Sequence, residues 1–263
     1  MVRGRGVSWG TLAAIVVAGA LLAGAVLAMT ALQDRVDQTR DFNDTFDGTT
    51  TVVVEGDSAQ IQIGVSPSGQ STTVRAQLRW NTVREPLYTS NFDGTVLRLR
   101  MGRCGLRIFG SYCESSLTLT VPQTVDLRVR NDSGDVRVSG VRGPVSVSAD
   151  SADVELTDLA GPLSIELDSG RLDGDRLTST RVEATLDSGS VTLAFLTAPA
   201  EVRARTDSGQ ITIAVPSGSG AYGVQASADS GQTHVDVATA TGTGRQINAE
   251  TDSGNITIQY HTV

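Results

Sequence analysis

Lysine is absent from this chain of 263 residues, and aromatic side chains, histidine and cysteine are scarce. All 21 basic residues are arginine and 29 residues are acidic, which gives a pI near 4.8. Such a chain lacks the basic surface that general nucleic-acid binding needs, so we expect no nucleic-acid partner. Aromatic residues make up 4% of the chain, whereas Val, Thr, Gly and Ser are abundant. That composition favours β structure with narrow layers over a bulky core.

Charged residues are also missing from one long segment, residues 9–32. Its 24 residues would make a helix of about 36 Å, enough to cross a hydrocarbon layer of about 30 Å with some tilt. Arg3 and Arg5 precede it and favour a cytoplasmic N-terminus. We therefore expect a cytoplasmic tail at 1–8, a transmembrane helix and an extracytoplasmic remainder, in a single-pass cell-membrane protein. A cleaved signal peptide ending near "AGAVLAMTA" is the alternative.

The two cysteines, Cys104 and Cys113, would close a ten-residue loop. In an oxidising compartment this spacing predicts a disulfide, and loop closure would contribute about 2.5–3 kcal/mol to stability. A metal site is the weaker interpretation, because no histidine or further cysteine accompanies the pair.

Alternation of apolar and polar residues begins after a polar, acidic segment at 33–48, which we interpret as a stalk. "TVRAQLRW" at 73–80 and "LRLRM" at 97–101 place apolar residues on one side and arginine or glutamine on the other. This period of two is typical of half-buried strands. We expect an N-terminal β part at 49–130 that includes the disulfide hairpin, and a repeat region at 131–263.

The repeat region is marked by Asp-Ser-Gly, once Asp-Ser-Ala, followed by an apolar-x-apolar segment. The seven copies begin at Asp132, Asp150, Asp168, Asp187, Asp207, Asp229 and Asp252. A period near twenty residues indicates a solenoid, because one coil cannot bury its apolar face alone and a stack can. The sequence thus predicts an all-β stacked β-solenoid with coils of roughly 18–23 residues. "GDSAQIQI" at 56–63 is a candidate degenerate copy.

The aspartates of these turns have a structural interpretation. Asp and Ser side chains can accept hydrogen bonds from the backbone N–H groups just ahead of them, and Gly supplies a positive φ. Such charge-assisted bonds exceed the repulsion of about 0.9 kcal/mol between carboxylates stacked about 4.8 Å apart in water, so we expect no metal. Calcium along the aspartate column is the alternative, although the nine-residue motif of calcium-binding solenoids is absent.

Catalysis is not expected, and no residue is assigned a catalytic role. A Ser-His-Asp arrangement needs a histidine, and the chain has only His234 and His261. Seven equivalent Asp-Ser pairs indicate a repeated structural task, whereas a nucleophile is needed once. Paired carboxylates, as in a polysaccharide-cleaving β-helix, are conceivable, but the sequence singles out no pair. No cofactor is implied.

Charge is distributed unevenly along the chain. Residues 75–107 contain seven arginines and two acids, whereas residues 131–263 contain 8 arginines and 18 acids. Arginine on the open side of a strand keeps it soluble, and the neighbouring aromatics would fill a cap at the start of the solenoid. The functional alternative is a surface for an anionic envelope polymer, acidic glycan or lipid head group. Its candidate residues are Arg75, Arg79, Arg98, Arg100 and Trp80.

The motifs "NDSGDVRVSG", "LDSGSVTLAF", "TDSGQITIAV" and "TDSGNITIQY", together with the N-terminal apolar segment, resemble a bacterial "putative adhesin" family of unknown biochemical function. The resemblance covers about residues 49–263. It implies a membrane-anchored β-solenoid on the cell surface and supplies no catalytic residues.

We therefore expect a non-enzymatic surface display or binding module, adhesin-like, whose partner is an envelope polymer or a membrane protein. The alternative is a sensory or regulatory subunit of an envelope-stress complex, which would need a membrane partner because the tail at 1–8 is too short for a signalling domain. The last coil shows no polar cap, so the sequence also predicts homo-oligomers through residues 252–260.

Overall fold

The computed structural model describes residues 37–66, 69–81, 85–102 and 112–261, and these residues form strands and turns without a helix. The all-β prediction is confirmed. The strands are β1 (Gln38–Asp47), β2 (Thr51–Val65), β3 (Ser71–Trp80), β4 (Tyr88–Phe92), β5 (Val96–Met101), β6 (Cys113–Val121), β7 (Asp126–Ser133), β8 (Val136–Ser139), β9 (Val145–Thr157), β10 (Leu163–Leu177), β11 (Arg181–Phe195), β12 (Glu201–Ser208), β13 (Ile211–Pro216), β14 (Gly223–Ser230), β15 (Thr233–Asp236), β16 (Gln246–Ser253) and β17 (Ile256–His261).

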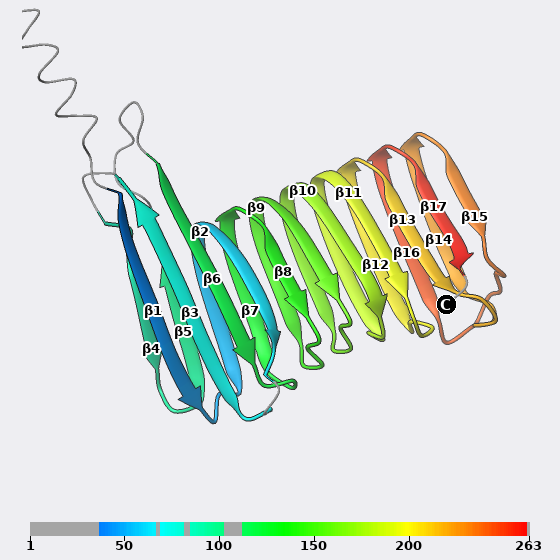
Figure 1. The fold of residues 1–263 in the computed structure, drawn as a ribbon. Coiled ribbons are helices and arrows are strands. Elements are labelled where there is room, and N and C mark those ends of the chain that lie inside the picture. The colour runs from blue at the N-terminus through cyan, green and yellow to red at the C-terminus, as the bar shows by residue number, and fades with distance from the viewer. Residues whose placement is uncertain (1–36, 67–68, 82–84, 103–111, 262–263) are drawn as a thin grey trace, which may run out of the picture.

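The strands stack as rungs along one axis (Figure 1). In a typical rung the chain runs along one arm, turns at an Asp-Ser-Gly corner, returns along a second arm and passes to the next rung. The arms form two ladders, and the long strands β2, β9, β10 and β11 bend at the corner and contribute to both. Ladder A has the order β4-β5-β2-β7-β9-β10-β11-β12-β16-β14. Ladder B has the order β1-β3-β6-β2-β8-β9-β10-β11-β13-β17-β15.

The Asp-Ser-Gly corners lie in one column, because the parallel pairing of neighbouring strands places their serines opposite one another. The paired serines, in spatial order, are Ser58, Ser133, Ser151, Ser169, Ser188, Ser208, Ser253 and Ser230. The series starts at Ser58, so the degenerate copy at 56–63 is a true rung. We call these turns the corner column.

Glycine is required in the corner column for two reasons. Gly189 has a φ of +140°, a region that side chains rarely adopt, and a Cβ on it would lie 1.8 Å from the carbonyl oxygen of Gly170 in the neighbouring rung. The rungs also bond through their corners: the Gly209 N–H donates to the Ser253 carbonyl over 2.8 Å. The close approach that this bond needs leaves no room for a side chain.

Stacking order differs from chain order at both ends. The last coil, β16 and β17, lies between the rung of β12 and β13 and the rung of β14 and β15, and Figure 1 shows its red strands between yellow and orange ones. Residues 252–260 are therefore inside the stack, and the prediction that they form its open end is wrong. At the other end β2 lies between the rung of β5 and β6 and that of β7 and β8.

The N-terminal end is closed by antiparallel strands. β1 pairs with β3, and β4 pairs with β5. The predicted stalk at 33–48 is thus wrong for residues 38–47. Phe42 lies 4.4 Å from Tyr88 and Phe46 lies 5.2 Å from Phe92 between ring centroids, so aromatic pairs bridge the two ladders here. The period-two pattern of β1 was obscured because its inward positions also include polar residues.

The core between the ladders consists of aliphatic columns. Leu193, Ile213 and Ile258 follow one another in ladder B and are all 0% exposed. Burial of each such side chain contributes about 1.5–3 kcal/mol. The outward positions of the same strands are polar, as the alternation predicted.

Two predictions fall outside the described residues. Residues 9–32 are among them, so the transmembrane helix stays a prediction; the part of the chain that the structure describes contains no helix able to span a bilayer. Cys104 is also outside, so its disulfide with Cys113 stays a prediction.

Candidate binding surfaces

The five predicted polymer-binding residues do not form one surface. Arg98 and Arg100 project from β5 on ladder A, whereas Arg75 and Arg79 project from β3 on ladder B. Alternation within a strand separates inward from outward residues, but it does not say to which ladder the strand belongs. Trp80 is 6% exposed and packs in the core, so it cannot stack on a ligand.

Ladder A instead joins Arg98 and Arg100 to Arg128 and Arg130 of β7, which sequence reasoning did not assign. Both strands flank the first half of β2, with Arg98 opposite Val53 and Val53 opposite Arg128, and with Arg100 and Arg130 on either side of Glu55. All four side chains are exposed. Strands two steps apart are separated by about 9.6 Å. We call Arg98, Arg100, Arg128 and Arg130 the arginine surface.

Three of these arginines have acidic partners. Arg98 lies 3.2 Å from Asp93, Arg100 lies 2.5 Å from Glu55 and Arg128 lies 2.8 Å from Asp126.

The Asp93 carboxylate also accepts the Val96 N–H over 2.9 Å, and this bond, followed by the one from Arg98, lowers the pKa of Asp93. Within the described residues, Arg130 has no carboxylate within ion-pair distance. Exposed pairs of this kind contribute little to stability, so the arginines can exchange their partners for an external anion.

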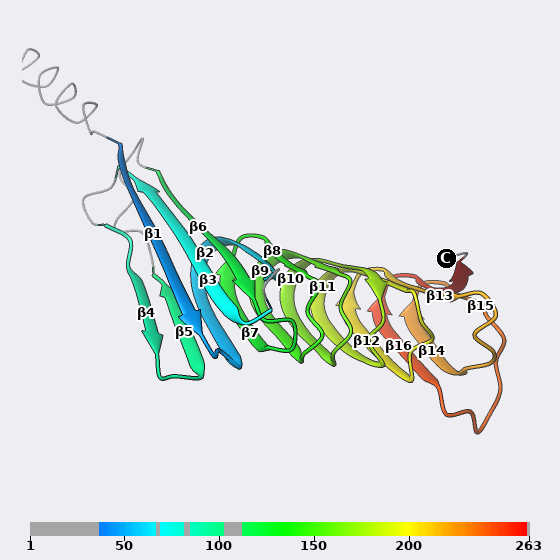
Figure 2. The same cartoon turned by 60° about the horizontal axis from the view of Figure 1, so that its bottom comes forward.

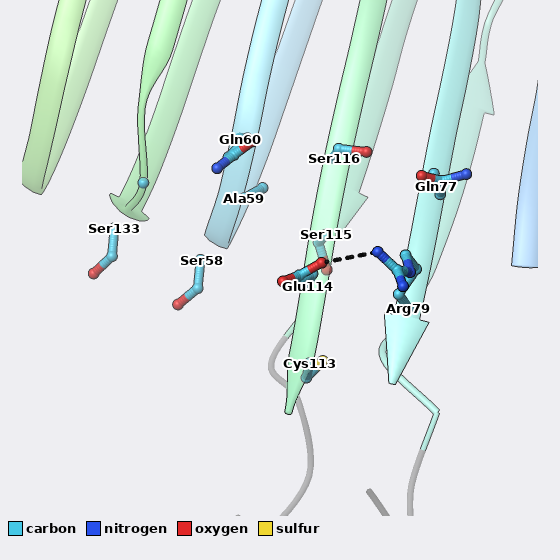
Figure 3. Close-up of a pocket in the computed structure, with 11 residues that line it drawn as sticks. Ser58, Ala59, Gln60, Gln77, Arg79, Cys113, Glu114, Ser115, Ser116 and Ser133 are labelled. Atoms are coloured by element: carbon cyan, nitrogen blue, oxygen red, sulfur yellow. Dashed lines mark ion pairs between the residues drawn. The ribbon is translucent and has the colours of Figure 1, made fainter. Parts of the chain in front are cut away.

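A shallow depression of about 440 Å³ lies on ladder B beside the corner column (Figure 3). Gln77, Ser116 and Gln60 cross its floor on three neighbouring strands, and Arg79 lies 3.6 Å from Glu114 at its edge. Its hydroxyl, amide and charged groups suit hydrogen bonding to a polar ligand.

Apart from Asp132, the corner aspartates do not make the predicted bonds to turn amides. Among the described residues, the carboxylates of Asp150, Asp168, Asp187 and Asp229 have no hydrogen-bond or ion-pair partner, and those of Asp207 and Asp252 each lie 3.8 Å from Arg205. The corner is held instead by glycine and by backbone bonds between rungs. Within the same residues no group of three or more His, Cys, Asp or Glu is placed to hold a metal ion.

Asn131 is a structural residue that sequence reasoning missed. It is 0% exposed, at a core position taken by Ala149 in the next rung. Its Nδ2 donates to the carbonyls of Ala59, Ser133 and Gly134 over 2.7–3.0 Å. Gly56 opposite leaves the necessary room, since a Cβ there would lie 2.4 Å from the Asn131 Oδ1. The sequence signal for this role is an Asn at a core position opposite a Gly, but the two residues can be matched only when the pairing register of the strands is known.

The two histidines lie at the C-terminal end of ladder B. A ring nitrogen of His261 lies 2.8 Å from the Phe195 carbonyl oxygen, and His234 on β15 is opposite Thr257. Both are far along the stack from the arginine surface on β5 and β7.

The architecture defines a class: an all-β, rung-stacked protein with two ladders. Residues 44–259 match the Toastrack DUF4097 family model, and the chain belongs to this family.

Similar solved structures include a "putative cell adhesion protein" from Clostridium sporogenes, at 9% identity and TM-score 0.40 over 85% of this chain and 100% of that one. A "putative adhesin" from Bacteroides fragilis shows 13% identity and TM-score 0.46 over 85% and 97%. A "putative lipid binding protein" from Parabacteroides distasonis shows 12% identity and TM-score 0.33 over 86% and 96%. A comparison with curated proteins finds no match.

Proposed function

We propose that this protein is a non-enzymatic, adhesin-like display and binding module on the cell surface, anchored through residues 9–32, and that it binds an anionic envelope polymer. The arginine surface is the observation that carries the proposal. It offers four exposed guanidinium groups on two strands at one end of the stack, in a chain whose net charge is −8.

The spacing of the arginines supports a polymeric ligand. Arg98 and Arg128 lie about 9.6 Å apart across β2, and Arg100 and Arg130 repeat that separation one step along the strands. A chain of phosphate or carboxylate groups can contact several of them at once. Guanidinium groups favour both anions, because their fork of N–H donors matches the oxygens.

The acidic remainder of the stack supports the same site. Residues 131–263 carry 18 acids against 8 arginines, so an anionic polymer is repelled from the repeat region. Binding is then confined to the N-terminal end, next to the proposed anchor.

The test uses the full chain, purified in detergent, with isolated cell envelopes and with beads coated with polyphosphate. The variant R98Q/R100Q/R128Q/R130Q should bind both at least about tenfold more weakly, since each arginine near an anionic surface contributes about 1 kcal/mol. Wild-type binding should weaken as salt is raised.

The matched control is R75Q/R79Q/R137Q/R171Q, which removes the same charge from ladder B, where these four side chains are also exposed. It should bind like the wild type. An equal loss of binding in both variants would mean that binding depends on net charge and not on the arginine surface. Unchanged binding by the ladder A variant would refute the proposal. Thermal melts show whether each variant is folded.

A further inference from the structure

The far end of the stack is unfinished. β14 and β15 form the last rung, which we call the open rung, and in the described residues they pair with β16 and β17 on one side. The core position of Val235 is 37% exposed, whereas Ile258 in the same column of the next rung is 0% exposed. Val224 and Ala226 are likewise half-buried, although their partners Ile247 and Ala249 are at most 1% exposed.

The open rung also presents unused backbone groups. The Gly223 N–H donates to the Arg245 carbonyl on the side of β16, and the Gln232 carbonyl accepts the Ile256 N–H on the side of β17. Because N–H and C=O groups alternate in direction along a strand, the intervening residues direct theirs away from the stack. These residues are Val224, Ala226 and Ala228 on β14 and Thr233 and Val235 on β15.

A following loop covers only the start of this edge. The Tyr222 N–H donates to the Ala238 carbonyl over 2.9 Å, and the Ala240 N–H donates to the Tyr222 carbonyl over 3.0 Å. Residues 224–228 continue past this contact. The loop thus covers the outer edge of β14 at Tyr222, and the edge beyond it is exposed and free to pair with another strand.

Protection against pairing is weak along the open rung. Residues 206–244 contain no arginine, and the strands β14 and β15 carry Asp229 and Asp236 as their acidic residues. Exposed edge strands are normally blunted by charged side chains, Pro or bulges. β1 at the opposite end follows that rule, with one arginine and three aspartates in ten residues.

We propose that the open rung is a contact for a second copy of this chain, which joins it end to end about a twofold axis. Two arrangements pair both edges antiparallel. If β14 met the partner's β15, the two Asp229 corners would lie together and repel. If β14 meets the partner's β14 and β15 meets the partner's β15, each Asp229 corner lies over the opposite turn, formed by residues 217–222 and 237–245, whose one charged residue is Arg245. Charge therefore selects the second arrangement, which is self-complementary as a twofold contact requires.

The position of the open rung gives this contact a role that rests on the proposed display function. Figures 1 and 2 place β1 and the open rung at opposite ends of the stack. Ladder A has ten strands, whose nine steps of about 4.8 Å span about 43 Å. An end-to-end pair places the two N-terminal ends at its far extremes, so it joins two facing surfaces.

The experiment is sedimentation equilibrium of the full chain in detergent, over a range of concentrations. The wild type should form dimers reversibly. Val235→Lys and, separately, Ala226→Pro should weaken the dimer at least about tenfold, because an edge charge or a missing edge donor blocks strand pairing. Ala226→Pro leaves the bonds to β16 intact, since its N–H points the other way. The matched control Thr212→Lys, on the outer side of β13, should dimerise like the wild type.

Hydrogen exchange gives a second readout that needs no variant. The amides of Val224, Ala226 and Ala228 should exchange more slowly as the concentration rises, while those of β1 should not change. A wild type that is monomeric throughout, or a Val235→Lys variant that dimerises as tightly as the wild type, would overturn the proposal. Polymer binding is measured at the arginine surface at the other end, so either proposal can fail without the other.

Discussion

The two ends of the stack differ in how the core between the ladders is closed off. At the N-terminal end, β1 and β4 add antiparallel strands, and the Phe42–Tyr88 and Phe46–Phe92 pairs bridge the gap between the ladders. At the C-terminal end, β14 and β15 repeat the rung of their neighbours with smaller side chains, and among the described residues only the contact of Tyr222 with Ala238 and Ala240 covers their outer edge. A repeat therefore extends a stack but does not finish it; finishing needs a sequence that departs from the repeat.

A feature common to both ends is that the first and last coils of the chain are not the outermost. β2 is covered by the rung of β5 and β6, and β16 with β17 is covered by the rung of β14 and β15. The last coil is thereby paired on both sides, and fraying from the C-terminus would have to break two sets of strand contacts.

Truncation of matched core positions should show the largest difference between the interior and the open rung. Ile213 and Val235 lie in the same column of ladder B, separated by Ile258. Ile213→Ala should lower the free energy of unfolding by about 2–5 kcal/mol, because it leaves a cavity between two rungs.

Val235→Ala should cost under about 1 kcal/mol, since the side chain is 37% exposed and no rung beyond it is left with a void. Urea unfolding of both variants measures the difference at protein concentrations below dimerisation. Equal losses would mean that the open rung is covered in the monomer, against the geometry described above.

Alanine at corner glycines should give a smaller contrast of the same sign. At Gly189 the added Cβ would lie 1.8 Å from the Gly170 carbonyl oxygen, and at Gly231 it would lie 1.7 Å from that of Gly254. Both also strain a positive φ. Gly189 is held between two rungs, so Gly189→Ala should cost about 2–4 kcal/mol.

The rung of Gly231 can move outward, so Gly231→Ala should cost about 1–2 kcal/mol less. Gly244→Ala is the control, because nothing lies within 4 Å of its Cβ position. Thermal melts of the three variants check the ranking, and a Gly189→Ala protein as stable as the control would contradict the corner packing.

Much of this fold could be predicted from the sequence, since strand alternation and a twenty-residue period are local signals. The degenerate rung at 56–63 was identifiable for the same reason. Rung order was not, because every coil carries the same corner and the same apolar columns, so any coil can stack on any other. The strand β1 was missed because Arg40 and Asp44 occupy inward positions of an edge strand, where solvent still reaches them.

The site was less predictable than the fold. The alternation of β5 identified Arg98 and Arg100 as outward-facing residues. Their neighbours Arg128 and Arg130 lie thirty residues further along the chain and come close to them only because β5 and β7 both pair with β2. Arg75 and Arg79 were excluded by ladder assignment, and Trp80 by burial. The amide bonds expected of the corner aspartates other than Asp132 do not form, because a turn amide that bonds to the next rung is no longer available to a side chain.

The buried last coil and the open rung both depend on the order of the rungs, and one hydrogen bond reports that order directly. In the structure the Gly209 N–H donates to the Ser253 carbonyl, and the Gly254 N–H donates to the Ser230 carbonyl. NMR of the selectively labelled chain should detect a through-hydrogen-bond coupling between the Gly209 nitrogen and the Ser253 carbonyl carbon. A coupling from Gly209 to Ser230 instead would show rungs stacked in chain order. It would contradict both the placement of β16 and β17 between two other rungs and the identity of the open rung.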